Sequence, residues 1–327
     1  MNKVYSFNFK SLKNIIITIL LVSVGTILGS LSAGKPDIDA QIIGGQTKQT
    51  QTQISRNKQK LTTQQKPTKA NLAKATGISL PQISPFSIKR DNLNIRGYNF
   101  VHPGTKRPTI ILSHGLGENQ ILNSRWIAQQ YQAGYNVTCF DFIGGGYVSQ
   151  SDGNMTDMSV VTEEKDLRAV INHVKTLAST DIHNLVLEGD SQGGLVSALV
   201  AGQSPDEFSK LILNYPAFSI PDDTRTVDAN TLPDTFKVFG GVITVGKKYV
   251  TDAQSIDVWS QIKNFKKPVM MNYGTSDGAI DQSFFHKAEQ TYSNIKSVSI
   301  PGVGLQHGFF NPLDFIKAQN ADVDFLK

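Results

Sequence analysis

Three residues that together could carry out nucleophilic chemistry each follow a short apolar run. Ser191 stands in the pentad GDSQG, Asp277 in the run GTSDG and His307 in the run GLQHG. The apolar runs before them occupy residues 185–187, 269–271 and 297–300. A serine hydroxyl attacks a carbonyl carbon when a neutral imidazole takes its proton, and a carboxylate must then steady the imidazolium. Ser191, His307 and Asp277 are therefore candidates for nucleophile, base and acid.

The apolar runs predict the elements that position these residues. A buried strand of a parallel sheet has an unbroken apolar run, and the turn after it lies at the carboxyl edge of the sheet. Such runs alternate with helical periodicity, so we expect a mostly parallel twisted sheet with helices on both faces. Strands are expected at 86–88, 95–98, 109–112, 137–140, 185–187 and 211–213, and helices at 124–132, at 162–177 and from 191. The chain order Ser, Asp, His is typical of the α/β-hydrolase fold.

The segment from about 216 to 257 interrupts this alternation. It is too long for an ordinary connection, so we expect a lid inserted after the sixth strand. Apolar side chains such as Phe236 and Ile243 could cover a pocket over Ser191. Its aspartates could accept a hydrogen bond from a polar acyl group and occupy positions 222, 223, 228 and 234.

A tetrahedral intermediate also needs two backbone N–H groups aimed at its oxyanion. We expect one from Gln192, directly after the nucleophile, and one from Leu116 in the turn SHGLG after a strand. In that turn His114 is expected to brace the loop. Asp281 competes with Asp277 for the role of acid, but it lies a full turn beyond the end of its strand, so Asp277 is favoured.

From about residue 86 onward, the chain resembles the bacterial cinnamoyl (feruloyl) esterases and their relatives among the α/β-hydrolases. The matching segments come in the order of that family: HGLGEN (114–119), DFIGGGYVSQSDG (141–153), MSVVTEEKDLRAVINHVK (158–175), GDSQGG (189–194), KPVMMNYGTSDG (267–278) and LQHGF (305–309). The resemblance implies Ser191, Asp277 and His307 as the triad, with Leu116 and Gln192 as the oxyanion donors. It also implies an esterase that works without a cofactor.

The sequence departs from that family at three places. Asp190 precedes the nucleophile, where the family usually has His, and the glycine loop after Asp141 is two residues longer. Cinnamoyl esterases tend to place a Tyr shortly after a Gly-Gly pair of the lid, to meet the phenolic hydroxyl of the substrate. Here Val242 and Ile243 follow that pair. This last difference puts hydroxycinnamate specificity in doubt.

Charge is distributed unevenly along the 327 residues. Residues 1–75 contain eleven of the 32 Lys and Arg residues but two of the 27 Asp and Glu residues, which gives this part about +9 and leaves about −4 for the rest. A nucleic-acid-binding domain would have its basic residues on the fold, so this distribution argues against nucleic acid as a partner. Cys139 is the single cysteine, and the sequence has no pair of His at helical spacing, so we expect neither disulfides nor a metal.

The amino-terminal segment, residues 1–34, has the pattern of a signal peptide or a membrane anchor. Lys3, Lys10 and Lys13 precede an uncharged apolar stretch at 14–34, long enough to cross a bilayer as a helix. Positive charge before the stretch predicts that everything after it lies outside the cell. The segment offers no clear cleavage site, so both a retained anchor and a secreted product stay open.

Residues 35–75 are rich in Gln, Thr and Lys and poor in large apolar residues. Such a composition predicts a disordered linker, because it cannot bury enough surface to offset the entropy of ordering. Its positive charges could attract anionic lipid or cell-wall polymers, or could only keep the linker soluble. The catalytic domain is expected at 76–327.

The sequence thus predicts a serine hydrolase that cleaves small or medium carboxylic esters through an acyl-enzyme, at the cell surface or after secretion. One alternative is a serine peptidase of the aminopeptidase type on the same fold. The other is a catalytically silent domain that serves as a surface binding module.

Overall fold

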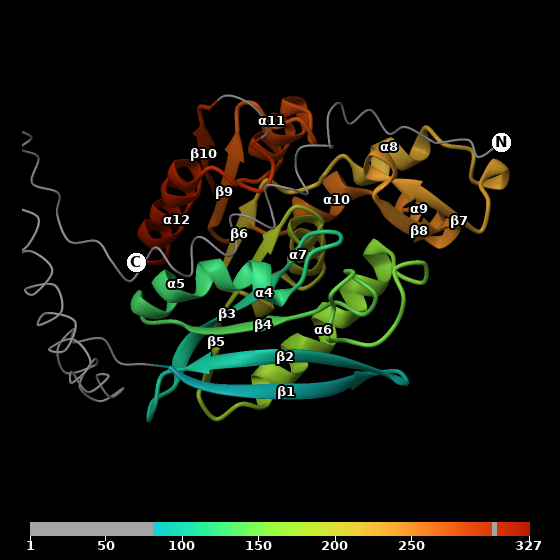
Figure 1. Ribbon diagram of the computed structural model, residues 1–327. Helices are drawn as coiled ribbons and strands as arrows, with labels where there is room; N and C mark the ends of the chain where they lie inside the picture. Colours follow the sequence, from blue (N-terminus) through green and yellow to red (C-terminus); the bar gives the residue numbers. More distant parts are fainter. Residues whose placement is uncertain (1–80, 303–305) are drawn as a thin grey trace, which may run out of the picture. The chain divides into compact units, whose positions relative to one another are not determined.

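The structure, a computed structural model, describes residues 81–302 and 306–327. Within these ranges eight strands form one sheet in the order β1-β2-β4-β3-β5-β6-β9-β10 (Figure 1). The strands are β1 (Gln82–Arg90), β2 (Leu93–Val101), β3 (Arg107–Ser113), β4 (Asn136–Phe140), β5 (Thr180–Asp190), β6 (Lys210–Asn214), β9 (Val269–Gly274) and β10 (Ile295–Ile300). The predictions for residues 1–75 lie outside the described residues.

The sheet is mostly parallel, as predicted. β1 and β2 form an antiparallel pair at one edge, and β2 pairs antiparallel with β4. From β4 to β10 every pairing is parallel, so the carboxyl ends of these strands share one edge of the sheet. The turns that follow β3, β5, β9 and β10 therefore start from the same edge, which is where the candidate residues lie.

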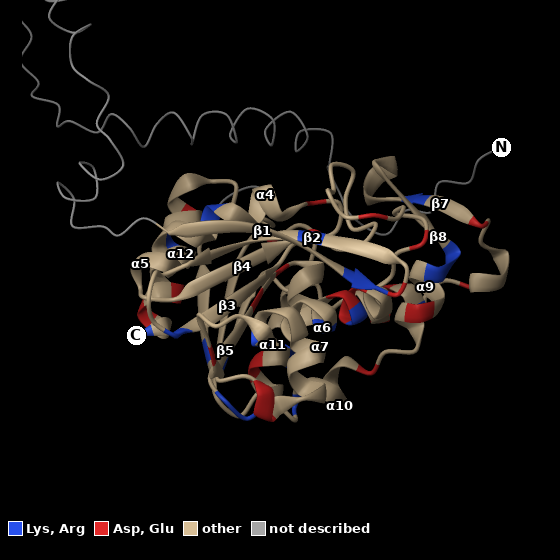
Figure 2. Cartoon of the chain, turned by 90° about the horizontal axis from the view of Figure 1, so that it is seen from below, with Lys and Arg blue, Asp and Glu red and all other residues tan. Residues whose placement is uncertain are grey.

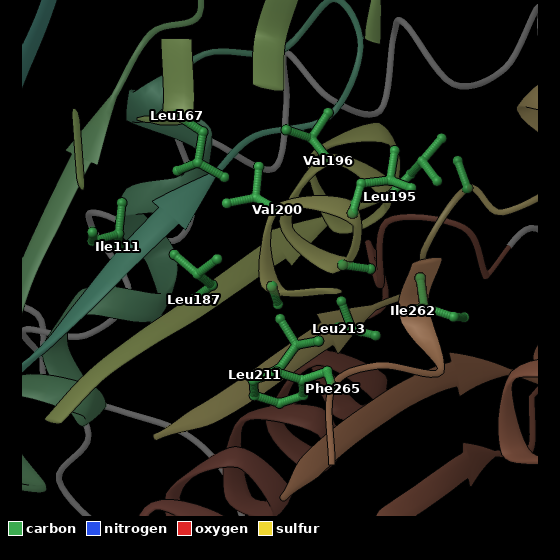
Figure 3. Close-up of a cluster of buried hydrophobic side chains, with 14 of the residues drawn as sticks. Ile111, Leu167, Leu187, Leu195, Val196, Val200, Leu211, Leu213, Ile262 and Phe265 are labelled. Carbon is green, nitrogen blue, oxygen red and sulfur yellow. The ribbon is translucent and has the colours of Figure 1, made fainter. Parts of the chain in front are cut away.

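Helices cover both faces of the sheet. Side chains alternate along the strands, so that Ile111, Leu187 and Leu211 point to one face while Ile110, Val186 and Ile212 point to the other. Figure 3 shows the first group in one hydrophobic cluster with Leu195 and Val200 of α7. The face with α7 is covered by α6 (Val160–Thr176), α7 (Gln192–Gln203), α10 (Val258–Ile262) and α11 (Gln282–Thr291), and the opposite face by α5 (Ile127–Gln132) and α12 (Pro312–Leu326).

One predicted helix differs in the structure. The segment expected as a single helix at 124–132 divides into a 3₁₀ turn, Ser124–Trp126, and the α-helix α5. The short helix α4 (Gln120–Asn123) precedes it, capped by the Asn119 side chain, which accepts from the N–H groups of Ile121 and Leu122. Three short helical pieces follow one another here, and the apolar pattern of the sequence does not separate them.

The segment expected as an insertion forms a small structure of its own after β6. It contains α8 (Ile220–Arg225), the antiparallel hairpin of β7 (Thr235–Val238) and β8 (Ile243–Gly246), and α9 (Lys247–Gln254). Its apolar side chains form a separate cluster with Met158, against which Leu116 and Ile243 pack. This excursion therefore contacts the turn after β3, in which one oxyanion donor is expected.

In the cartoon of Figure 2, segments with Lys and Arg residues and segments with Asp and Glu residues are interspersed along the described residues. Among these residues, no helix is long and apolar enough to cross a membrane. The predicted anchor at 14–34 lies outside them.

Candidate active site

Ser191 lies at a sharp turn between β5 and α7. Its backbone has φ +51° and ψ −116°, a conformation that residues other than glycine rarely adopt. The turn is tight, because a Cβ on Gly189 would come within 2.2 Å of the Gly193 carbonyl oxygen. The Ser191 N–H donates to Asn214 at 2.9 Å, and its carbonyl accepts from Ala217 at 2.9 Å. These contacts hold the hydroxyl above the edge of the sheet, as in the nucleophile elbow of hydrolases.

The structure brings the three candidate residues into one hydrogen-bonded chain. The Ser191 Oγ lies 2.8 Å from Nε2 of His307, and Nδ1 of His307 lies 2.9 Å from Oδ2 of Asp277. The second carboxylate oxygen of Asp277 accepts from the N–H groups of Ala279 and Ile280 at 2.8 and 2.9 Å. The Asp277 side chain is fully buried and that of His307 is 18% exposed. This arrangement leaves Nε2 free to take the Ser191 proton.

Asp281 does not join this chain. It caps α11, where its carboxylate accepts from the N–H and the hydroxyl of Ser283, at 2.9 and 2.5 Å. No hydrogen bond to His307 is found for it in the described part of the chain. Of the two acids that the sequence offers, Asp277 is the one in contact with the imidazole.

Nearby negative charges favour the protonated form of His307. Burial by itself would lower the pKa of this imidazole, but the carboxylate of Asp277 and the charges of Glu118 and Asp190 outweigh burial and raise the pKa above its usual value. They stabilise the imidazolium that forms when His307 takes a proton. As the pH falls through this raised pKa, His307 becomes protonated and can no longer act as a base.

The turn after β3 lies directly against the nucleophile. A Cβ on Gly115 would lie 3.2 Å from the Ser191 Cβ, and a Cβ on Gly193 would come within 2.3 Å of the Ser113 carbonyl oxygen. The approach at Gly193 leaves no room for a side chain, and a side chain at Gly115 would fit only if its neighbours shifted. They place the backbone that carries the Leu116 and Gln192 N–H groups beside the Ser191 hydroxyl, where an oxyanion would form.

Two side chains brace the turn after β3. His114 is fully buried; the Phe142 N–H donates to its Nε2 at 3.0 Å, so its proton lies on Nδ1, which donates to the Gly115 carbonyl at 2.8 Å. The Glu118 carboxylate accepts from the Gly115 N–H at 3.0 Å. The bond from His114 Nδ1 and the bond to Glu118 both involve the backbone of Gly115, which directly precedes Leu116. His114 is thus engaged on both ring nitrogens and is not placed for proton transfer at Ser191.

The side chain of Gln192 connects the nucleophile turn to the excursion after β6. Its amide donates to Glu163 of α6 at 2.8 Å, and its carbonyl accepts from the Tyr249 hydroxyl of α9 at 2.7 Å. Burial raises the pKa of Glu163 well above its ordinary value. The residue whose N–H is expected to bind the oxyanion is therefore fixed from both sides.

A network of buried polar side chains lies below the site, on the face of the sheet opposite α7. Asn272 donates to Asp322 of α12 at 2.6 Å and to Asn214 at 2.9 Å. Asn214 in turn donates to Glu188 and Asp190 of β5, at 3.3 and 3.1 Å. Burial, reinforced by the negative charge of nearby carboxylates, raises the pKa values of Glu188 and Asp322 well above their ordinary values.

We expect Asp322→Asn to stabilise the protein, and to do so more at about pH 8 than at about pH 5. The unfolded Asp322 side chain ionises near its ordinary pKa, whereas the folded one stays protonated to higher pH. The wild-type protein therefore loses stability as the pH rises between these two pKa values, and asparagine does not titrate. Each kcal/mol gained would raise Tm by about 2–4 °C.

Thermal melts of both proteins across this pH range measure the effect. Asp324→Asn is the matched control, because Asp324 is exposed on the same helix and its pKa is lowered by Lys327. A Tm difference for Asp322→Asn that stays the same at every pH would contradict the prediction.

Sequence reasoning missed several residues of this site. Glu118 stands in the matching segment HGLGEN, so the resemblance contained a signal for it. Glu163 likewise stands in a matching segment, MSVVTEEKDLRAVINHVK, whereas Tyr249 had no such signal and meets Gln192 across 57 residues. Among the described residues, no group of three His, Cys, Asp or Glu side chains could hold a metal ion.

Comparison with solved structures decides the fold. The structure titled "Ferulic Acid bound to Est1E from Butyrivibrio proteoclasticus" matches with a TM-score of 0.67 and 25% identity, covering 74% of this chain and 97% of that one. An esterase of Pyrococcus furiosus matches with a TM-score of 0.55 and 19% identity, over 78% of this chain and 92% of that one. The chain has the α/β-hydrolase fold.

Sequence comparisons find similarity to a serine aminopeptidase family and to acylamino-acid-releasing enzymes. The model of the serine aminopeptidase S33 family matches residues 104–243, which include Ser191 but neither Asp277 nor His307. The human acylamino-acid-releasing enzyme is 22% identical over 252 residues, which are 69% of this chain and 32% of that enzyme. The chain thus spans about a third of the length of the curated relatives it matches.

Proposed function

We propose that this α/β-hydrolase is a serine hydrolase that cleaves carboxylic esters through an acyl-enzyme. The observation that carries the proposal is the chain of contacts from Ser191 through His307 to Asp277, with 2.8 and 2.9 Å between the bonded atoms. The strained turn at Ser191 supports it further, because such strain is kept where it serves function.

The geometry supports the usual two-step reaction. Ser191 Oγ attacks the ester carbonyl carbon while its proton passes to Nε2 of His307, and the Leu116 and Gln192 N–H groups donate to the oxyanion. The intermediate collapses, the C–O bond to the alcohol breaks, and His307 gives its proton to the leaving alkoxide. Water then repeats the sequence on the acyl-enzyme, which releases the carboxylic acid and restores the Ser191 hydroxyl.

Labelling with a fluorophosphonate tests whether the site works as proposed. The folded protein should react once, at Ser191, and should release p-nitrophenol from p-nitrophenyl butyrate. Folded protein that neither labels nor hydrolyses any ester would favour the silent binding module instead.

In this proposal the excursion after β6 serves as a lid, and an apolar residue occupies its contact with the turn after β3. Ile243 at the start of β8 contacts the turn after β3, since a Cβ on Gly117 would lie 2.9 Å from the Ile243 Cδ1. Tyr147 reaches the same hairpin, but its hydroxyl already donates to the Val242 carbonyl at 2.8 Å and accepts from the Thr244 N–H at 3.1 Å. An apolar side chain thus stands beside the oxyanion turn.

We therefore expect methyl ferulate and methyl caffeate to be no better substrates than simple short-chain or unsubstituted aryl esters. A ring hydroxyl buried without a partner costs about 1–3 kcal/mol, which corresponds to roughly tenfold to a hundredfold in kcat/KM. The comparison is made with methyl cinnamate, which has the same leaving group. A clear preference for methyl ferulate would mean that another group of the lid supplies the contact.

A serine peptidase is the second candidate, favoured by a polar cavity behind the triad. The cavity, of about 270 Å³, is lined by Asp223, Ser219 and Asp281 and reaches Asp277. Its carboxylates could bind the α-amino group of an amino-terminal residue, and the match to the serine aminopeptidase family points the same way. Aminoacyl-naphthylamides hydrolysed faster than p-nitrophenyl esters would favour the peptidase.

A further inference from the structure

Arg125 contacts three separate segments at the carboxyl edge of the sheet. One guanidinium nitrogen donates to the carbonyl oxygen of Gly308 at 2.9 Å. Another donates to the Tyr215 hydroxyl at 2.6 Å and to the Asp190 carboxylate at 3.3 Å. Gly308 follows β10, Tyr215 directly follows β6, and Asp190 is the last residue of β5. The planar guanidinium of Arg125, whose nitrogens have a fixed geometry, therefore links three segments that lie far apart in the sequence.

Each of these partners neighbours a residue of the proposed triad. Asp190 directly precedes Ser191, and Gly308 directly follows His307. The ring of Tyr215 packs edge-on against that of His307, with 4.9 Å between the ring centres. Arg125 itself touches neither Ser191 nor His307 by a hydrogen bond in the described part of the chain, so it acts on them through these neighbours.

The surroundings hold the pair of Arg125 and Asp190 in place. The Asp190 carboxylate is 1% exposed and also accepts from the Trp126 indole N–H at 2.9 Å and from Asn214 at 3.1 Å. The guanidinium carbon lies 5.2 Å from the Trp126 ring centre and 5.0 Å from that of Phe315. A carboxylate this deeply buried depends on its cation, since removal of one partner leaves an uncompensated charge.

We propose that Arg125 and Asp190 form a positioning pair that keeps Ser191 and His307 at the distance needed for proton transfer. The inference rests on the proposed function, because it assumes that these two residues react. Displacement of a catalytic group by about 1 Å can cost about a hundredfold in rate. Asp190 also stands where the cinnamoyl esterases usually have histidine, so the pair is a feature of this chain.

The pair also sets the charge around the imidazole. The carboxylates of Asp277, Glu118 and Asp190 act on His307, and Arg125, which has the opposite charge, interacts with Asp190 and Glu118. Removing Asp190 should therefore lower the pKa of His307, and removing Arg125 should raise it. A residue that only stabilised the fold would not give opposite changes.

Three variants separate positioning from charge, measured by kcat and KM for p-nitrophenyl butyrate and by the pH profile of kcat/KM. Arg125→Met should lower kcat about 10- to 100-fold with little change in KM, and should move the acidic limb to higher pH. Asp190→Asn should move that limb to lower pH. Arg125→Lys keeps the charge, so the acidic limb of its kcat/KM profile should coincide with that of the wild type. A single ammonium cannot hold three partners, so its kcat should stay low.

Arg168→Met is the matched control. Arg168 is 27% exposed, against 26% for Arg125, and pairs with Glu207 at 3.0 Å while donating to Val200 and Ser204. Its loss should leave kcat and the pH profile unchanged. Circular dichroism and thermal melts check the folding of each variant, and Arg125→Lys is the variant to use if Arg125→Met does not fold.

Two results would overturn the inference. One is folded Arg125→Met or Arg125→Lys with kcat within twofold of wild type. The other is an acidic limb of the kcat/KM profile that lies at the same pH in Arg125→Met and in Asp190→Asn. Failure of the proposed function looks different, because the wild-type protein would then neither react with a fluorophosphonate nor hydrolyse the ester.

Discussion

Replacing Ser191 by alanine is expected to lower kcat for any ester substrate by roughly 10⁵–10⁶-fold, as for other serine triads. The loss is this large because the Ser191 Oγ is the atom hydrogen-bonded to Nε2 of His307, at 2.8 Å. Alanine removes this nucleophile completely. The turn should survive, because serine and alanine meet the same strain at φ +51°. Steady-state kinetics with p-nitrophenyl butyrate, with circular dichroism as a check on folding, measure the effect.

Ser197→Ala is the matched control for that experiment. Ser197 lies on the same helix, α7, is fully buried, and its hydroxyl has no hydrogen-bond partner in the described structure. Its replacement should leave kcat within about twofold, since no paired group is lost. If folded Ser191→Ala kept more than a tenth of the wild-type activity, the nucleophile would have to be sought elsewhere.

The strands and the candidate residues could be predicted because both depend on short segments. Residues 185–187 and 269–271 are apolar throughout, because helices cover both faces of these parallel strands and neither face is exposed to solvent. The structure extends β5 to Thr180–Asp190, including the exposed residues 182–184, which the apolar pattern could not indicate. The order of Ser191, Asp277 and His307 then fixed which turns had to meet at the carboxyl edge.

The supporting residues could not be predicted, because their partners lie far away in the sequence. Arg125 meets Asp190 across 65 residues and Gly308 across 183, and no motif connects them. Tyr249 reaches Gln192 from a segment that the sequence identified as an insertion but not as a hairpin followed by a helix. Such contacts depend on the order of strands and the path of connections, which a local pattern does not contain.

Asp277→Asn is expected to lower kcat by about 10³–10⁴-fold, the second largest effect. Asp277 accepts on both oxygens, from Nδ1–H of His307 on one and from the Ala279 and Ile280 N–H groups on the other. Asparagine has one acceptor oxygen. Its amide nitrogen must therefore face either the two backbone donors or the imidazole, and in the second case the proton of His307 moves to Nε2, where it blocks transfer from Ser191.

Asp281→Asn should cost little, and the comparison of the two variants decides which carboxylate is the acid. Asp281 caps α11 by accepting from the Ser283 N–H, and asparagine caps a helix about as well as aspartate. Both substitutions remove one negative charge within the same loop, so a general effect of charge would lower kcat in both. Kinetics with p-nitrophenyl butyrate measure the ranking, and a larger loss for Asp281→Asn would transfer the role of acid to Asp281.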